Sequence, residues 1–200
     1  MARKARRTSE DDTNYWTGYT DLLSSSLLIL VLTIAISALA RSDNEKPPLV
    51  RLTERESFRF PTGSYVLSPE FIKALDRRVP EILETIQKYR IDSVEVIGHT
   101  DGQPSPGTSN LDLLMPKANR SATLSGYRAG SNADLGLLRA LAVANHLKSR
   151  LDPEGKIGLT IRPYSAGSLI ANDGAYAPAD TTDRADRRRI ELRFTRQQEG

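Results

Sequence analysis

Three ionisable residues stand at positions where their chemistry needs an explanation. Asp21 lies at the head of the one long apolar run, in the segment GYTDLLSSSLLILVL (18–32). Asp101 follows a segment that alternates like a strand, and Arg139 lies near the start of an amphipathic segment. A carboxylate at a strand end can pair with an ammonium group, and a guanidinium group offers a planar fork that fits a carboxylate. These residues are therefore candidates for ion binding and for recognition of a charged ligand.

Asp21 is the first candidate, because an ionisable group inside a membrane is costly. From Leu22 to Ala40 the chain has no charged residue, and a helix of this length would span about 28 Å, close to the roughly 30 Å of a bilayer core. We predict a cytoplasmic basic tail at 1–17 and a transmembrane helix at 18–40, with a cleavable signal peptide as the competing interpretation. Asp21 then either reaches the membrane interface or carries an ion. Desolvation favours the protonated form of a carboxyl group, which suits the loading and release of a proton.

Three serines lie one turn beyond Asp21, and their hydroxyl groups are of the right type to assist it. Ser24 and Ser25 could bind the carboxylate or a cation, and they could equally be small residues that let neighbouring helices approach closely. Lysine and arginine residues gather before the apolar run, whereas charges of both signs follow it. This asymmetry favours a cytoplasmic N-terminus and places the rest of the chain on the other side of the membrane.

After Ala40 the sequence predicts a linker at 41–56 and an α+β domain at 57–196. Alternating segments and apolar residues at helical spacing predict strands at 57–60, 92–99, 157–165 and 188–194 and helices at 69–86 and 134–151. We expect Ser68 to cap the first helix and Pro80 to kink or split it. The order β-α-β-α-β-β implies helices on one face of a mixed sheet. Residues 103–131 form a long loop, which is typical of a functional or disordered segment, and its LDLLMP piece (111–116) is apolar enough to dock on the domain.

Composition excludes several classes of function. Cysteine is absent, which removes disulfides, thiolate chemistry and cysteine metal sites. The net charge of +3 is too mild to argue for nucleic acid, and no aromatic cluster lies in a basic segment. The two histidines, His99 and His146, lack metal-ligand spacing, and no serine has a plausible base beside it. The RADRRR run (184–189) is expected to form buried pairs or solvated charge. We therefore expect neither an enzyme nor a bound cofactor.

Four segments resemble the outer-membrane-protein-A-like (OmpA-like) peptidoglycan-binding domain in their order and spacing, namely FRFPTGSYVLSPE (58–70), VEVIGHTDG (94–102), SNADLGLLRALAVANHL (131–147) and DRADRRRIELRF (183–194). In that family an aspartate and an arginine clamp the amine and the carboxylate of the diamino acid of the peptidoglycan stem. The resemblance implies that Asp101 and Arg139 have these roles, with hydrogen bonds from Thr100 and Asn132. The alternative is that Asp101 and Arg139 pair with each other. The sequence departs from the family in the long loop, in PYSAGSLIAND (163–173) and in Arg187, where an asparagine is usual.

The segment WTGYTDLLSSSLLILVL (16–32) is similar to the membrane helix of the B subunit of MotB-type ion-driven stator motors, and Asp21 falls on the family's ion-carrying aspartate. The resemblance implies a homodimer inside a pentameric ring of a multi-span, MotA-like A subunit in a bacterial inner membrane. It also implies a periplasmic domain bound to peptidoglycan and transport of H⁺ or Na⁺. Flagellar rotation and Zorya anti-phage defence use this plan. The alternatives are a passive membrane-anchored tether to the cell wall, and a sensor or defence module whose long loop binds another partner.

Overall fold

The computed structural model describes residues 7–43, 47–54, 57–115, 124–152 and 158–196. The chain divides into two compact units, residues 1–46 and 47–200. The basic residues Arg3, Lys4 and Arg6, on which the predicted orientation partly depends, lie outside the described residues.

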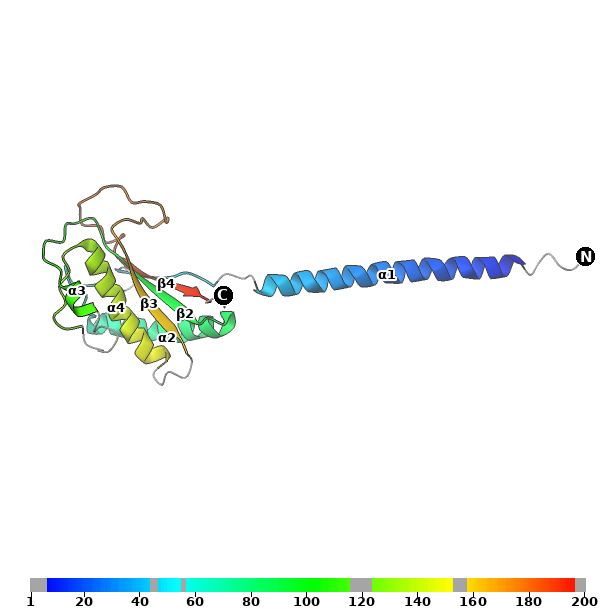
Figure 1. Cartoon of the computed structure of the whole chain (residues 1–200), viewed down its shortest axis with the longest axis horizontal. Helices are drawn as coiled ribbons and strands as arrows, with labels where there is room; N and C mark the ends of the chain where they lie inside the picture. Colours follow the sequence, from blue (N-terminus) through cyan, green and yellow to red (C-terminus); the bar gives the residue numbers. More distant parts are fainter. Residues whose placement is uncertain (1–6, 44–46, 55–56, 116–123, 153–157, 197–200) are drawn as a thin grey trace, which may run out of the picture. The chain divides into compact units, whose positions relative to one another are not determined.

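The N-terminal unit contains one helix, α1 (Arg7–Asp43) (Figure 1). Within it, Tyr15–Leu39 has a mean hydropathy of 2.4 and is long and apolar enough to cross a membrane. The side chains of this span are exposed throughout. Three of its hydroxyl groups donate to carbonyl groups one turn earlier, Thr20 to Trp16 O at 2.8 Å, Ser26 to Leu22 O at 2.8 Å and Thr33 to Ile29 O at 2.7 Å. The helix therefore satisfies these polar groups internally, as an apolar surrounding requires.

The C-terminal unit is built on a mixed four-stranded sheet with the order β1-β4-β2-β3. Its strands are β1 (Val50–Thr53), β2 (Ser93–His99), β3 (Thr160–Gly167) and β4 (Arg189–Thr195). β4 pairs antiparallel with β1 and β2, and β2 pairs parallel with β3. With the two long helices, the order of elements is the predicted β-α-β-α-β-β, and the α+β class is confirmed.

The first strand lies earlier in the chain than the sequence predicted. We expected a strand at 57–60 after a linker at 41–56, but β1 lies inside that linker and pairs with β4. Phe58 and Phe60 are buried, and their rings contact Phe71 with centroid distances of 5.2 and 4.8 Å. The alternation of Phe58 and Phe60 therefore reflects burial of the two rings in the core and not strand pairing in the sheet. Leu52 fixes β1 instead, because its side chain is fully buried. Residues 44–46 and 55–56 of the predicted linker lie outside the described residues.

Two helices cover one face of the sheet. Helix α2 (Pro69–Tyr89) begins at the predicted cap, where Ser68 accepts a hydrogen bond from the amide of Phe71 at 3.1 Å. It continues through Pro80 without the predicted split. Helix α4 (Asn132–Leu151) begins two residues earlier than predicted, because Ser131 caps it by accepting from the amide of Asp134. The buried apolar residues of α2 and part of those of α4 form one core with one face of the strands, to which the sheet contributes Leu52, Val94, Val96, Ile190, Leu192 and Phe194.

The long loop docks on α4 by a second, smaller apolar cluster. Its short helix α3 (Leu111–Leu114) buries Leu111 against Tyr127, Leu138 and Leu141. The loop is therefore partly ordered against the domain, as its apolar LDLLMP piece predicted. Residues 116–123 of the loop lie outside the described residues.

Candidate functional site

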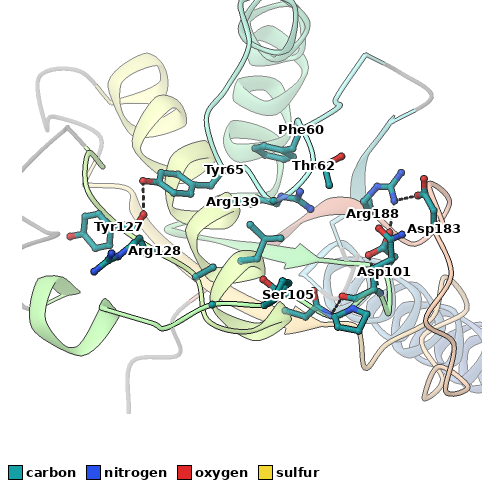
Figure 2. A pocket seen from close by; sticks show the side chains of 18 of the residues that line it. Phe60, Thr62, Tyr65, Asp101, Ser105, Tyr127, Arg128, Arg139, Asp183 and Arg188 are labelled. Atoms are coloured by element: carbon teal, nitrogen blue, oxygen red, sulfur yellow. Dashed lines mark hydrogen bonds and ion pairs between the residues drawn. The ribbon is translucent and has the colours of Figure 1, made fainter.

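A pocket of about 440 Å³ opens at the end of the sheet where β2 stops and β4 starts (Figure 2). The pocket is lined by charged side chains of both signs. Segments that are distant in sequence meet there, among them the residue after β1, the residues after β2, the residues before β4 and the first turns of α4. Its charged and polar lining includes Glu54, Arg59, Asp101, Arg128, Asn132, Arg139, Asp183 and Arg188.

A close approach of two backbones sets the distance across this pocket. Gly98 of β2 and Gly136 of α4 touch so closely that a Cβ atom added to Gly98 would lie 2.0 Å from the carbonyl oxygen of Gly136. A side chain at position 98 would force the two backbones apart, so glycine at this position allows the contact. Asp101 follows Gly98 by three residues, and Arg139 follows Gly136 by three residues, or just under one helical turn. The glycine contact therefore brings the two predicted ligand-binding residues to the same pocket.

Arg139 is a buried cation without a carboxylate partner among the described residues. Its side chain is 3% exposed, its guanidinium carbon lies 4.8 Å from the centroid of the Phe60 ring, and its Nε donates to Ser64 O at 3.0 Å. Burial lowers the pKa of Arg139 to about 10, so the group stays charged at neutral pH. One face of the guanidinium is occupied by the ring, and its remaining N–H groups are left to bind an anion in the pocket.

Asp101 has partners other than Arg139. Its carboxylate accepts hydrogen bonds from the amides of Gln103 and Arg184, both at 3.4 Å, and forms a short ion pair with Arg188 Nη1. The alternative in which Asp101 and Arg139 pair with each other is therefore not what the structure has. Figure 2 shows Arg139 in the middle of the pocket, with Asp101 and Arg188 together at one side.

Arg188 gathers three carboxylates around one guanidinium group. Its Nε and Nη2 bind the two carboxylate oxygens of Glu54 at 2.8 and 3.0 Å, and its Nη1 contacts Asp101 and Asp183. The pKa of Arg188 is raised above its ordinary value, chiefly by the hydrogen bonds to Glu54. Three negative charges against one positive charge leave this side of the pocket acidic, whereas Arg139 makes the neighbouring side basic.

The two remaining predicted peptidoglycan-binding residues, Asn132 and Thr100, differ in whether their side chains line the pocket. Asn132 lines the pocket, and its Nδ2 donates to Gln103 O at 2.8 Å, which holds the start of the long loop against α4. Thr100 is 2% exposed and lies beside the pocket and not in its wall. Its amide donates to Gly167 O at 2.8 Å, and its hydroxyl group is buried without a hydrogen-bond partner in the described part of the chain. Thr100 thus secures the strand end, while Asn132 remains a residue that a ligand can reach.

The long loop supplies a wall of the pocket that sequence patterns did not predict. Residues 103–108 and 127–129 line it. The hydroxyl group of Tyr65 donates to Leu124 O at 2.7 Å and lies 3.2 Å from Tyr127 O, a second possible acceptor, and the hydroxyl group of Tyr127 donates to Leu114 O at 3.0 Å. Two tyrosines therefore fasten the loop beside the site.

The predicted ion site lies in the other unit and is described by itself. Asp21 is in α1, and Ser24 and Ser25 follow it by three and four residues, so helix geometry places all three on one side of α1. All three side chains are exposed. The hydroxyl of Ser26 is already bonded to Leu22 O, whereas those of Ser24 and Ser25 have no such bond in the described residues.

No protein-family model matches the sequence, and no curated protein matches it. The chain is similar to solved MotB domains. The periplasmic domain of Helicobacter pylori MotB (residues 97–256) is 21% identical, with 76% of this chain and 84% of that chain covered and a TM-score of 0.47. A MotB-like protein of Desulfovibrio vulgaris is 18% identical, with 74% and 75% covered and a TM-score of 0.46.

A third solved structure, described as the cell wall anchor of the type VI secretion system of Pseudomonas aeruginosa, is 24% identical, with 73% of this chain and 80% of that chain covered and a TM-score of 0.41. At these identities the likeness concerns the fold. The assignment of ligands and partners to this chain therefore depends on its own residues.

Proposed function

We propose that this chain is the B subunit of an ion-driven motor of a bacterial inner membrane, held to peptidoglycan by its C-terminal domain. The observation that carries the proposal is a combination within one chain. A helix of membrane length carries the carboxyl group of Asp21, and a separate domain carries a pocket with an acidic side and an unpaired buried cation, Arg139.

The pocket suits a group that bears an ammonium and a carboxylate on one carbon atom. Asp101 and its neighbouring carboxylates favour the ammonium, because Arg188 neutralises only one of their three charges. Arg139 favours the carboxylate, which would gain a planar, charge-assisted pair of hydrogen bonds. Asn132 is placed to bind either group. The free end of the diamino acid in a peptidoglycan stem peptide has this chemistry.

The membrane helix suits proton or sodium transfer. Asp21 would load an ion in contact with a MotA-like A subunit, and Ser24 and Ser25 would supply oxygen atoms to the loaded site. Two copies of this chain inside a pentameric ring of that subunit would turn the ring as the ion moves. The output is a flagellar-type rotation or a Zorya-type defence response.

The first test is the composition of the complex that is extracted gently from the native membrane and weighed by native mass spectrometry. Two copies of this chain with five copies of a multi-span protein are expected. The variant Asp21→Asn should assemble the same complex and lose ion-driven activity, because the amide cannot exchange a proton. A complex that contains this chain alone would contradict the motor.

The second test concerns the wall. Binding of a soluble tripeptide that ends in meso-diaminopimelate is expected for the full chain in detergent, and Arg139→Gln should abolish it. The same peptide with its diaminopimelate carboxyl groups amidated is the matched control, because it lacks the charges that Arg139 would bind. Equal binding of the two peptides would contradict the proposed ligand.

A passive cell-wall tether is the alternative function. The position of Asp21 near the N-terminal end of the span favours it, since Trp16 and Tyr19 lie close by with ring centroids 6.2 Å apart, as interfacial aromatic residues do. A tether would bind the stem peptide and tolerate Asp21→Asn without any loss. The motor would bind the peptide equally well and fail with that substitution.

A further inference from the structure

We propose that Glu54 is a positioning residue of the ligand pocket and that, through Glu54, ligand binding and the docking of strand β1 stabilise each other. The inference rests on the proposed function of this pocket. It assigns a role in ligand binding to a residue and a strand that lie outside the four predicted peptidoglycan-binding residues.

The contact between Glu54 and Arg188 fixes the orientation of a guanidinium group. The pair is bidentate, with distances of 2.8 and 3.0 Å, and the two side chains are 8% and 15% exposed. A bidentate pair holds the plane of the guanidinium as well as its position. The third nitrogen, Nη1, is thereby aimed at Asp101. Glu54 thus helps to set where the carboxylate of Asp101 stands in the pocket.

Strand β1 depends on few contacts of its own. It lies at the edge of the sheet and pairs with β4 over four residue pairs. Leu52 is its one buried side chain, and the exposed Arg51 has one ion pair, with Glu191 of β4 at 3.5 Å. Edge segments with few buried contacts open at a low free energy compared with the whole domain. Glu54 follows β1 directly, so its ion pair with Arg188 closes the strand at its C-terminal end.

Opening of β1 would therefore change the pocket. Glu54 would leave with the strand, and Arg188 would keep Asp101 and the exposed Asp183, whose side chain is 67% exposed. One negative charge would be lost from the acidic side, and the guanidinium would be free to turn on Asp101. Both changes weaken the binding of an ammonium group at this point.

Thermodynamic linkage makes the effect reciprocal. If the docked strand binds the ligand more tightly than the open strand by some factor, the ligand shifts the docking equilibrium of β1 by the same factor. Strand β1 is also the first strand of the domain after the segment that leads from α1. Binding of a ligand in the pocket would consequently stabilise the docked state of β1, the strand with which the chain enters the domain.

Hydrogen exchange of the full chain in detergent, followed with and without the soluble tripeptide ending in meso-diaminopimelate, tests this inference. In the wild-type protein a saturating amount of peptide should slow amide exchange in β1 at least tenfold. Glu54→Gln keeps the shape of the side chain and removes its charge, and it should weaken peptide binding about tenfold. It should also remove most of the protection of β1 by the peptide.

Two further variants separate the possible causes. Glu81→Gln is the control, because it makes the same glutamate-to-glutamine change at an exposed arginine ion pair (Arg78 Nη1 to Glu81 Oε2, 2.9 Å) on the surface of α2; it should change neither quantity. Leu52→Ala loosens β1 without touching the pocket, and it should weaken peptide binding severalfold. Thermal unfolding of each variant shows that the domain is folded at the temperature of the assay.

The outcomes distinguish the inference from the function on which it rests. Binding of the peptide by the wild-type chain with unchanged exchange in β1 would overturn the inference and leave the proposed ligand intact. Unaltered binding by Glu54→Gln would also overturn it. No binding by the wild-type chain would overturn the proposed ligand, and the inference with it.

Discussion

The backbone contact between β2 and α4 gives the sharpest prediction, for the substitution Gly98→Ala. The added Cβ atom would lie 2.0 Å from the carbonyl oxygen of Gly136 and 2.7 Å from its carbonyl carbon, whereas real Cβ contacts are not shorter than 3.0 Å. The helix and the strand must therefore separate by at least 3.0 − 2.0 = 1.0 Å at this point. Neither atom belongs to a side chain that could turn away.

Overpacking of a close contact costs about 1–3 kcal/mol, and a clash with backbone belongs at the upper end of that range. We expect Gly98→Ala to lower the free energy of unfolding by about 3 kcal/mol and the melting temperature by about 10 °C. Arg139 lies less than one turn after Gly136, so the displaced helix should also weaken binding of the diaminopimelate peptide about tenfold. Circular dichroism during heating and urea titration measures the first effect, and calorimetric titration measures the second.

Gly136→Ala is the companion variant. Its Cβ would meet the hydroxyl oxygen of Ser165 at 2.4 Å and Gly98 O at 2.9 Å. The hydroxyl group can rotate away, and alanine in a helix is better than glycine by about 1 kcal/mol, so the net loss should be about 1 kcal/mol. Equal unfolding midpoints for Gly98→Ala and the wild-type protein would refute the reasoning, as would a larger loss for Gly136→Ala than for Gly98→Ala.

Three further predictions concern single side chains. Arg139→Lys keeps the charge and loses both the planar fork and the stacking on Phe60, so peptide binding should weaken at least tenfold with little change in the unfolding midpoint; calorimetric titration checks this. Burial raises the pKa of Glu191, but the contacts with His99 and Arg189 outweigh burial and lower it from 4.5 to about 2. Its contribution is therefore complete above about pH 4.5 and is lost as the pH falls toward 2, by up to about 3 kcal/mol. Urea titrations between pH 3 and pH 7 should show this loss in the wild-type protein and a smaller one in Glu191→Gln. Tyr65→Phe removes the donor to Leu124 O and should cost about 1 kcal/mol, seen as faster amide exchange in residues 124–129.

Local patterns in the sequence predicted much of the fold. The cap at Ser68 and the apolar faces of the two helices are short-range features, and the structure places α2 and α4 where they predict, except that the cap at Ser131 starts α4 two residues earlier. The position of β1 could not be read in this way. Phe58 and Phe60 alternate as strongly as a strand does, whereas β1 has a single buried residue. Pairing with β4 decides the strand, and that contact is long-range.

The residues of the candidate site differ in the same way, because some could be predicted from the sequence and others depend on long-range contacts. Asp101 and Arg139 were predicted from the resemblance of their segments to the OmpA-like domain, and the structure brings both to one pocket. Glu54 was not predicted, because its role depends on Arg188, which is 134 residues away. The RADRRR run was expected to form buried pairs or solvated charge, and Arg189 forms a buried pair with Glu191 at 2.9 Å. No local pattern in the sequence predicted which arginine of that run would line the pocket.

The register of β1 determines how the domain would resist a mechanical force applied at its N-terminal end. Val50 lies opposite Leu192 and Thr53 lies opposite Arg189, so the strand runs from the middle of β4 to the pocket end of the sheet. A force between a bound wall fragment and the chain before Val50 would act along the strand axis. All the β1–β4 hydrogen bonds would then resist by shear at once, whereas a strand peeled from one end loses them one after another. Through this geometry a strand of only four residues can serve as a firm mechanical joint.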